Sequence, residues 1–135
     1  MKVTTAVRST LAQELIAAMA NGTTNPNPII EIYAGNMPAS MGGTIVNTKL
    51  ATLTLTTTVA TESNGVITFE TITEDSSADN TDRAAWCRVL DRESTEVIYL
   101  TINDDGSGEI NFNSADLVAG SPVAIGELVL TIGGE

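Results

Sequence analysis

Residues 49–59 read KLATLTLTTTV, and this alternating stretch decides the fold class. Its apolar side chains all fall on one side: Ala51, Leu53, Leu55 and Val59. Successive side chains of a strand point to opposite faces of a sheet, so this alternation predicts a half-buried β-strand. Thr, Ile and Val contribute 20, 12 and 10 of the 135 residues. Because branched Cβ atoms fit strands better than helices, the whole composition favours a sheet protein.

Further strands are predicted on both sides of this stretch, with turn signals between them. Asn64-Gly65 predicts the turn after 49–59, which makes 66–72 its partner strand. The other predicted strands are 29–34, 84–91, 96–102, 109–113 and 121–132. No helical pattern lies between the strands, which excludes a parallel βαβ sheet. We therefore predict an all-β domain over 29–135, an antiparallel β-sandwich that is jelly-roll-like.

One amphipathic α-helix is predicted before the strands, over residues 4–20. Its apolar stripe has helical spacing through Val7, Leu11, Leu15 and Ala18, and it is widened by Ala12, Ile16 and Met19. Thr4 or Thr5 can cap its start, and Asn21-Gly22 is a stop signal. Residues 22–28 form a Pro/Asn linker, so 1–28 is predicted as a separate N-terminal unit. Two interpretations of the stripe stay open, packing on the chain's own sheet or docking on a neighbouring subunit.

Charge is distributed unevenly along the chain, whose formal net charge is −11. Residues 1–60 carry a net charge of +1, and residues 61–135 carry −12. Six Lys and Arg against 17 Asp and Glu argue against binding to nucleic acid. No stretch is apolar enough for a membrane span or a secretory signal. We expect a chain that begins at Met1 in a reducing cytoplasm, or in a particle assembled there.

Little in the sequence indicates catalysis, metal binding or a cofactor. The chain has no histidine, which removes the usual general base and the commonest metal ligand. Asn103, Asp105 and Ser107 resemble a calcium loop, but its twelfth position is Ser114 instead of the required Glu. The lone Cys87 is predicted as a small buried residue of a strand. We expect no enzyme, no cofactor and no metal site.

Two further features bear on packing and contacts. Trp86 is predicted as a core anchor of its strand, with Arg88 on the same face. Residues 35–48 form a long loop rich in Gly and Met, and such loops often contact a partner. Met37 and Met41 are therefore candidate contact residues, although a loop folded back on the domain is an equal alternative.

Several segments, in order, resemble a family of small virion proteins of tailed bacteriophages and prophages. The resemblance covers about residues 3–133. It rests on TTAVRSTLAQELIAAM, EIYAG, LATLTLT, NGVITFETIT, DSSAD before AAWCRVLD, and GEINFNSADLVAGSPVAIGELVLTI. Cys87 departs from the family pattern, which has an aromatic residue there, and the loop at 35–48 is idiosyncratic. The resemblance transfers no catalytic residues.

This resemblance implies a capsid decoration, or cement, protein with a jelly-roll-like sandwich. Its expected partner is the major capsid protein, and its expected place is the outer surface of the virion capsid, with the host cytoplasm during assembly. A homo-oligomer on the shell, a dimer or a trimer, is also expected. Val7, Leu11, Leu15, Met37 and Met41 would contact the capsid or a sister copy. The alternatives are a tail or fibre-joining protein and, less favoured, a surface or glycan-binding module.

Overall fold

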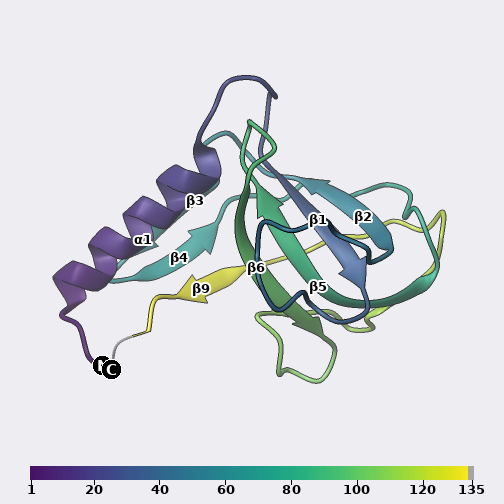
Figure 1. Ribbon diagram of the computed structural model, residues 1–135. Coiled ribbons are helices and arrows are strands. Elements are labelled where there is room, and N and C mark those ends of the chain that lie inside the picture. The colour runs from purple at the N-terminus through teal and green to yellow at the C-terminus, as the bar shows by residue number, and fades with distance from the viewer. Residues whose placement is uncertain (134–135) are drawn as a thin grey trace.

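The computed structural model describes residues 1–133, in which one helix precedes two curled, mainly antiparallel sheets (Figure 1). The helix is α1 (Thr5–Ala20). The strands are β1 (Ile29–Ala34), β2 (Lys49–Thr54), β3 (Ala60–Ser63), β4 (Val66–Phe69), β5 (Asp82–Leu90), β6 (Glu96–Asn103), β7 (Ile110–Asn111), β8 (Asp116–Leu117) and β9 (Val129–Thr131). The chain is therefore mostly β, as its composition predicts.

The larger sheet forms the body of the molecule. Its strand order is β2-β1-β5-β6-β7, and β8 pairs with β5 beside this path. β1 is central because Ile32 lies opposite Ala51 on one side and opposite Cys87 on the other. The alternation within each strand sends one set of side chains into the core and the other to the outer face. The inward set includes Ile30, Ile32, Cys87, Val89, Leu100 and Ile102.

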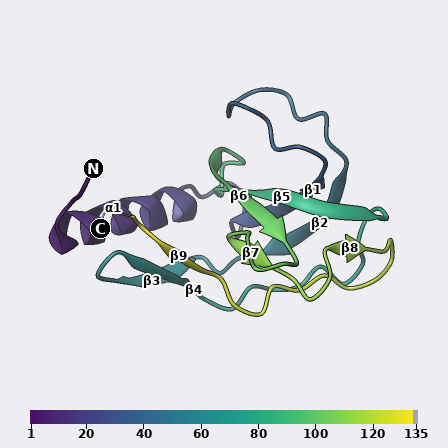
Figure 2. The same ribbon diagram turned by 90° about the horizontal axis from the view of Figure 1, so that it is seen from below.

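The smaller sheet and the helix form an arm that projects from this body. Its strand order is β3-β4-β9, and α1 lies along this sheet (Figures 1 and 2). Ala12 and Met19 of α1 are completely buried. Both belong to the same apolar cluster as Ile30 and Ile32 of the large sheet, so one continuous core joins arm and body.

The stretch 49–59 is not one strand, which corrects the predicted hairpin. Regular pairing of β2 ends at Thr54, and Val59 has a positive φ of 67°. A β-branched residue rarely adopts that conformation, so it marks a break in the chain direction. The chain resumes as β3, and Asn64 and Gly65 (φ 54° and 84°) form a two-residue turn into β4. The predicted turn is present, but it joins 60–63 to 66–69.

Two other predicted strands are much shorter than expected. The segment 109–113 contributes only β7, which pairs parallel to β6 and departs from the predicted antiparallel pattern. The segment 121–132 contributes only β9, while Val123 makes an isolated bridge with Asp75. Pro122 has no backbone N–H to donate, and such residues interrupt regular pairing.

Helix α1 has the predicted ends. The Thr4 hydroxyl accepts a hydrogen bond from the backbone N–H of Val7 (3.3 Å), which caps the first turn. Asn21 ends the helix in an extended conformation, and Gly22 follows with a φ of 104°. The linker is then held by Glu93, whose carboxylate accepts hydrogen bonds from the backbone N–H groups of Thr23 and Thr24 (2.9 and 2.7 Å).

Candidate docking surface

The predicted apolar stripe of α1 is divided between the core and the surface. Val7 and Leu11 keep 45% and 48% of their surface exposed, and Leu15 is half-buried. Ala12 and Met19 pack inward, and Leu15 and Ile16 are partly buried against the same core cluster. Successive residues of a helix advance by about 100°, so the buried residues form one edge of the wide stripe, and Val7 and Leu11 form its other edge. The helix therefore has an inner and an outer apolar side.

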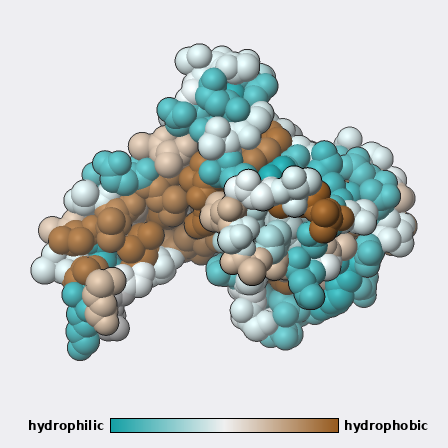
Figure 3. All heavy atoms as spheres, viewed as in Figure 1, coloured by the Kyte–Doolittle hydropathy of each residue, from teal (hydrophilic) through white to brown (hydrophobic). Residues whose placement is uncertain are grey.

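A hollow of about 230 Å³ continues the outer stripe toward the body. It lies between α1, β6 and β9, and Leu15 forms its helix side. Its other apolar lining residues are Ile98, Leu100, Val129, Leu130 and Ile132. Val129 is itself 40% exposed. Figure 3 shows apolar side chains gathered over α1 and continuing across this recess toward the body. We call Val7, Leu11, Leu15, Ile98, Val129 and Ile132 the arm surface.

A second hollow of about 510 Å³ lies at the C-terminal end of the same helix. Ala17 and Ala18 line it from α1, Asn21 lines it just after the helix, and Val97 lines it from β6. Its carboxylates are Glu14, Asp91 and Glu96. The first hollow has one carboxylate on its rim, from Glu109. Among residues 1–133, no Lys or Arg side chain lines either hollow.

The rim carboxylates differ in how they are compensated. Glu96 is paired with Arg88 (2.7 Å), and Asp91 accepts hydrogen bonds from the backbone N–H groups of Glu93 and Thr95. Glu14 and Glu109 are exposed, and within residues 1–133 neither forms an ion pair; the Glu109 carboxylate accepts a hydrogen bond from the Thr101 N–H (2.9 Å). Each hollow therefore has an exposed carboxylate without a cationic partner.

Three of the five aromatic residues gather on the outer face of the large sheet. Trp86 is fully buried and stacks on Tyr33, with ring centroids 4.7 Å apart. The centroid of the Tyr99 ring lies 4.9 Å from that of the Trp86 ring. The three rings come from β5, β1 and β6. The indole Nε1 has no hydrogen-bond partner in the described structure. Trp86 therefore anchors the body and is not a surface platform.

An ionic network borders these rings. Arg88 pairs with Glu31 (2.8 Å) and with Glu96 (2.7 Å), and the Tyr33 hydroxyl donates to Glu31 (3.0 Å). Burial, with the Glu31 carboxylate beside it, raises the pKa of Tyr33 to about 12. Burial opposes ionisation of Glu96, but hydrogen bonds from Tyr99 and Arg88 outweigh it and lower the Glu96 pKa. The network holds three strands in register.

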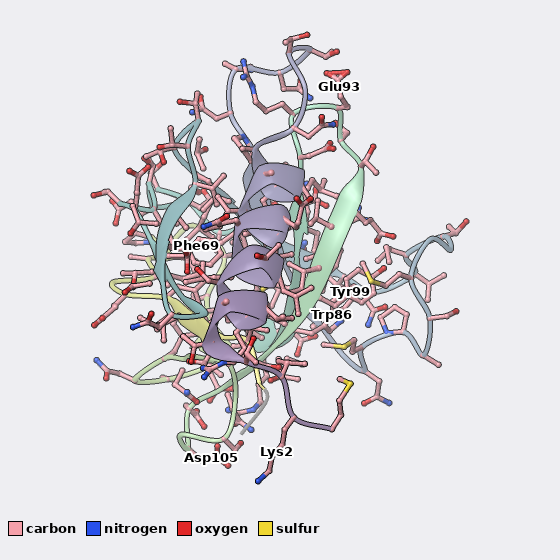
Figure 4. The ribbon with its side chains drawn as sticks, turned by 90° about the vertical axis from the view of Figure 1, so that its left-hand side faces the viewer. Lys2, Phe69, Trp86, Glu93, Tyr99 and Asp105 are labelled. Atoms are coloured by element: carbon pink, nitrogen blue, oxygen red, sulfur yellow. The ribbon has the colours of Figure 1, made fainter. Side chains whose placement is uncertain are left out.

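The loop 35–48 is tied to this network instead of to α1. The Gly42 N–H donates to Glu96 Oε1 (2.8 Å), and the Asn47 side chain donates to the carbonyl oxygen of Ala34 (2.8 Å). Met41 is 47% exposed, and Met37 is half-buried. In Figure 4, β6 lies between α1 and this loop. The structure therefore does not bring the two methionines together with Val7, Leu11 and Leu15.

The acidic turn at 103–109 uses its side chains within the protein. Asp104 pairs with Arg83 (2.7 Å), which holds the Asp104 pKa at about 2, and Asp105 accepts a hydrogen bond from the Ser107 N–H (2.9 Å). No cluster of three or more potential metal ligands occurs in the part of the chain that the structure describes. Cys87 is fully buried, and burial raises its pKa to about 12, which leaves the thiol unreactive.

Sequence patterns missed the body half of the arm surface. Ile98 and Ile132 look like ordinary inward-facing strand residues, and Val129 lies on the opposite face from Leu128 and Leu130. A usable signal lies in α1, where apolar or small residues cover more than one side of the helix. A wide apolar stripe of this kind is compatible with a second neighbour besides the helix's own sheet.

Comparison with family models, curated proteins and solved structures gave no match. Within residues 1–133, no helix has the length and apolar character needed to cross a membrane.

Proposed function

We propose that this chain is a structural protein of a tailed-bacteriophage virion, a capsid decoration protein that binds the assembled head. The observation that carries this proposal is the arm surface, because exposed Val7 and Leu11 continue into a hollow instead of ending on polar surface. Isolated exposed apolar residues are common, but a continuous apolar surface is typical of a protein interface. The resemblance of residues 3–133 to small phage virion proteins supplies the partner class.

In this proposal the two sheets and α1 form a rigid, jelly-roll-like sandwich that presents the arm surface to the major capsid protein. Binding only to assembled shells would stabilise them by mass action. Copies bridging neighbouring capsid subunits would follow the local symmetry axis, which sets whether two or three sit together. In this proposal the chain lies on the outer surface of the capsid.

The glycan-binding alternative receives no support from the aromatic residues. Sugar sites stack exposed rings against the ligand, whereas Tyr33 and Trp86 are buried and Phe69 is 8% exposed. Tyr99 and Phe112 are partly covered. A tail or fibre-joining protein would use the same kind of apolar surface. Whether the protein binds heads or tails therefore distinguishes that alternative from a decoration protein.

Heads purified from a phage that lacks this gene test the proposal by add-back of the purified protein. We expect wild-type protein to co-sediment with heads at a saturating copy number and to raise their disruption temperature. The Val7→Ser/Leu11→Ser variant should lose this binding while it keeps the monomer fold. Val46→Ser/Val118→Ser is the matched control, because both residues are exposed elsewhere in the chain.

Two results would contradict the proposal. One is wild-type protein that does not bind heads at any concentration. The other is electron microscopy that places the protein on tails, which would favour the tail-protein alternative.

A further inference from the structure

We infer that the arm surface receives an apolar segment flanked by lysine or arginine side chains, supplied by the partner protein. This inference rests on the proposed function and specifies the chemistry of the partner. The apolar part follows from Leu15, Ile98 and Val129 in the first hollow. The basic part follows from the rims of the two hollows.

The charged groups that line the two hollows are carboxylates, and no described Lys or Arg lines either hollow. Glu14 lies on the exposed side of α1, and Glu109 lies across the first hollow before β7. Both are exposed, and neither forms an ion pair within residues 1–133. A bound segment would lower the water content around them, which strengthens their attraction to a positive charge.

The basic side chains of this region are engaged or distant. Arg8 donates from Nε to the carbonyl oxygen of Ile132 (2.9 Å), at the N-terminal end of α1. Lys2 lies beyond that end of the helix (Figure 4). Arg88 is held between Glu31 and Glu96. A positive charge that complements Glu14 and Glu109 would therefore come from the partner, because no described Lys or Arg lines the two hollows.

The same charges disfavour a second copy of this chain as the occupant. Two arm surfaces placed face to face would bring Glu14 and Glu109 of each copy together, without a Lys or Arg from the hollows to pair with them. Each copy also carries a net charge of −11. Like charges opposed across an interface suppress that association.

Fluorescent peptides of about 15 residues test the inference with the intact protein. The Leu/Lys peptide has Leu residues at helical spacing and Lys residues between them. The Leu/Glu peptide has the same sequence with each Lys replaced by Glu. We expect the Leu/Lys peptide to bind and the Leu/Glu peptide not to bind, by fluorescence anisotropy. Leu11→Ser and the pair Glu14→Gln/Glu109→Gln should each weaken binding by about tenfold.

The matched control separates this site from the general acidity of the chain. Glu74→Gln/Glu127→Gln removes the same charge from exposed residues that line neither hollow. This control pair should weaken binding by less than about twofold at an ionic strength of about 0.15 M, where distant charges are screened. Equal losses in the two pairs, or equal binding of the two peptides, would overturn the inference.

Sedimentation of the protein alone tests the second copy as occupant. We expect the wild-type protein and the Leu11→Ser variant to have the same oligomeric state. An oligomer that Leu11→Ser dissociates would overturn the inference.

Failure of the proposed function is distinguishable from failure of this inference. If wild-type protein binds the Leu/Lys peptide but does not bind heads, this result contradicts only the proposed function. Heads that bind Glu14→Gln/Glu109→Gln as tightly as wild type contradict only this inference.

Discussion

Arg88 is the residue on which the outer face of the large sheet depends. Its guanidinium bridges Glu31 on β1 and Glu96 on β6, and its Cζ atom lies 5.6 Å from the Tyr33 ring centroid. The Arg88 and Glu31 side chains keep only 19% and 12% exposure. At such sites the loss of one partner costs more than the pair contributes, because the remaining charge stays buried.

We predict that Arg88→Met lowers the free energy of unfolding by about 1–3 kcal/mol, measured by urea denaturation. Adding Glu31→Gln should restore part of this loss, because it removes the carboxylate that was left behind. Arg83→Met is the control, since the Arg83 side chain is 48% exposed and its ion pair is screened by water. Equal losses at Arg83 and Arg88, or strictly additive effects of Arg88→Met and Glu31→Gln, would contradict the prediction.

Sequence alternation placed Trp86 and Arg88 on one face of their strand, and the structure has them there. It could not supply Glu31 as a partner, because the pairing of Glu31 with Arg88 depends on β1 lying next to β5. That neighbourhood is long-range information, since the two residues are separated by the whole 35–48 loop and the small sheet's hairpin. Alternation within one strand predicts which face of the sheet a side chain lies on. The register between paired strands decides which side chains it contacts on that face.

The β3–β4 hairpin is the element that brings the helix and the small sheet together. An ideal Cβ on Gly65 would lie 2.8 Å from Arg8 Cβ of α1, and Gly65 also has a positive φ of 84°. The turn therefore needs glycine for two reasons, backbone conformation and close approach.

We predict that Gly65→Ala destabilises the protein more than Gly120→Ala does. Gly120 has a similar φ of 87° but no neighbouring atom within 4 Å of its ideal Cβ, so it reports the conformational cost alone. That cost is about 1–2 kcal/mol, and the contact with Arg8 should add roughly 1 kcal/mol or more. Thermal unfolding of both variants measures the difference. Equal shifts in Tm would show that α1 moves away from the turn at no cost.

Elements with strong local signals were predicted well, and elements made by long-range pairing were not. The helix, its Thr4 cap and the Asn64-Gly65 turn depend on neighbouring residues, and all three are present. The strand at 49–59 was predicted too long, because nothing local reveals that Val59 adopts a positive φ. The parallel pairing of Ile102 with Ile110 likewise has no local signal.

The division of charge along the sequence does not become a division of the molecule into two faces. β1, from the near-neutral half, lies between β2 and β5, so the two halves of the chain share one sheet. Ser9 and Gln13 of α1 both donate hydrogen bonds to Glu62 of the acidic half (2.6 and 2.9 Å). The relevant charge pattern is therefore local, at the rims around α1.

The integration of α1 into the core decides how its function can be tested. Ala12 and Met19 have no exposed surface, and burial of a side chain the size of Met stabilises a protein by roughly 1.5–3 kcal/mol. Truncation of residues 1–22 would remove this burial together with the contacts of α1 to Glu62 and Ile132. A truncated chain that fails to bind would thus not distinguish a lost docking surface from a damaged fold.

We predict that truncation of residues 1–22 lowers Tm by on the order of 10 °C and exposes the apolar face of β3 and β4. The Val7→Ser/Leu11→Ser variant should change Tm little, because both side chains already contact water. Differential scanning calorimetry measures the first effect, and binding of the dye ANS measures the second. An unchanged Tm without dye binding in the truncated chain would mean that the small sheet is stable without its helix. A large fall in Tm for Val7→Ser/Leu11→Ser would mean that the outer stripe supports the core and is not reserved for a partner.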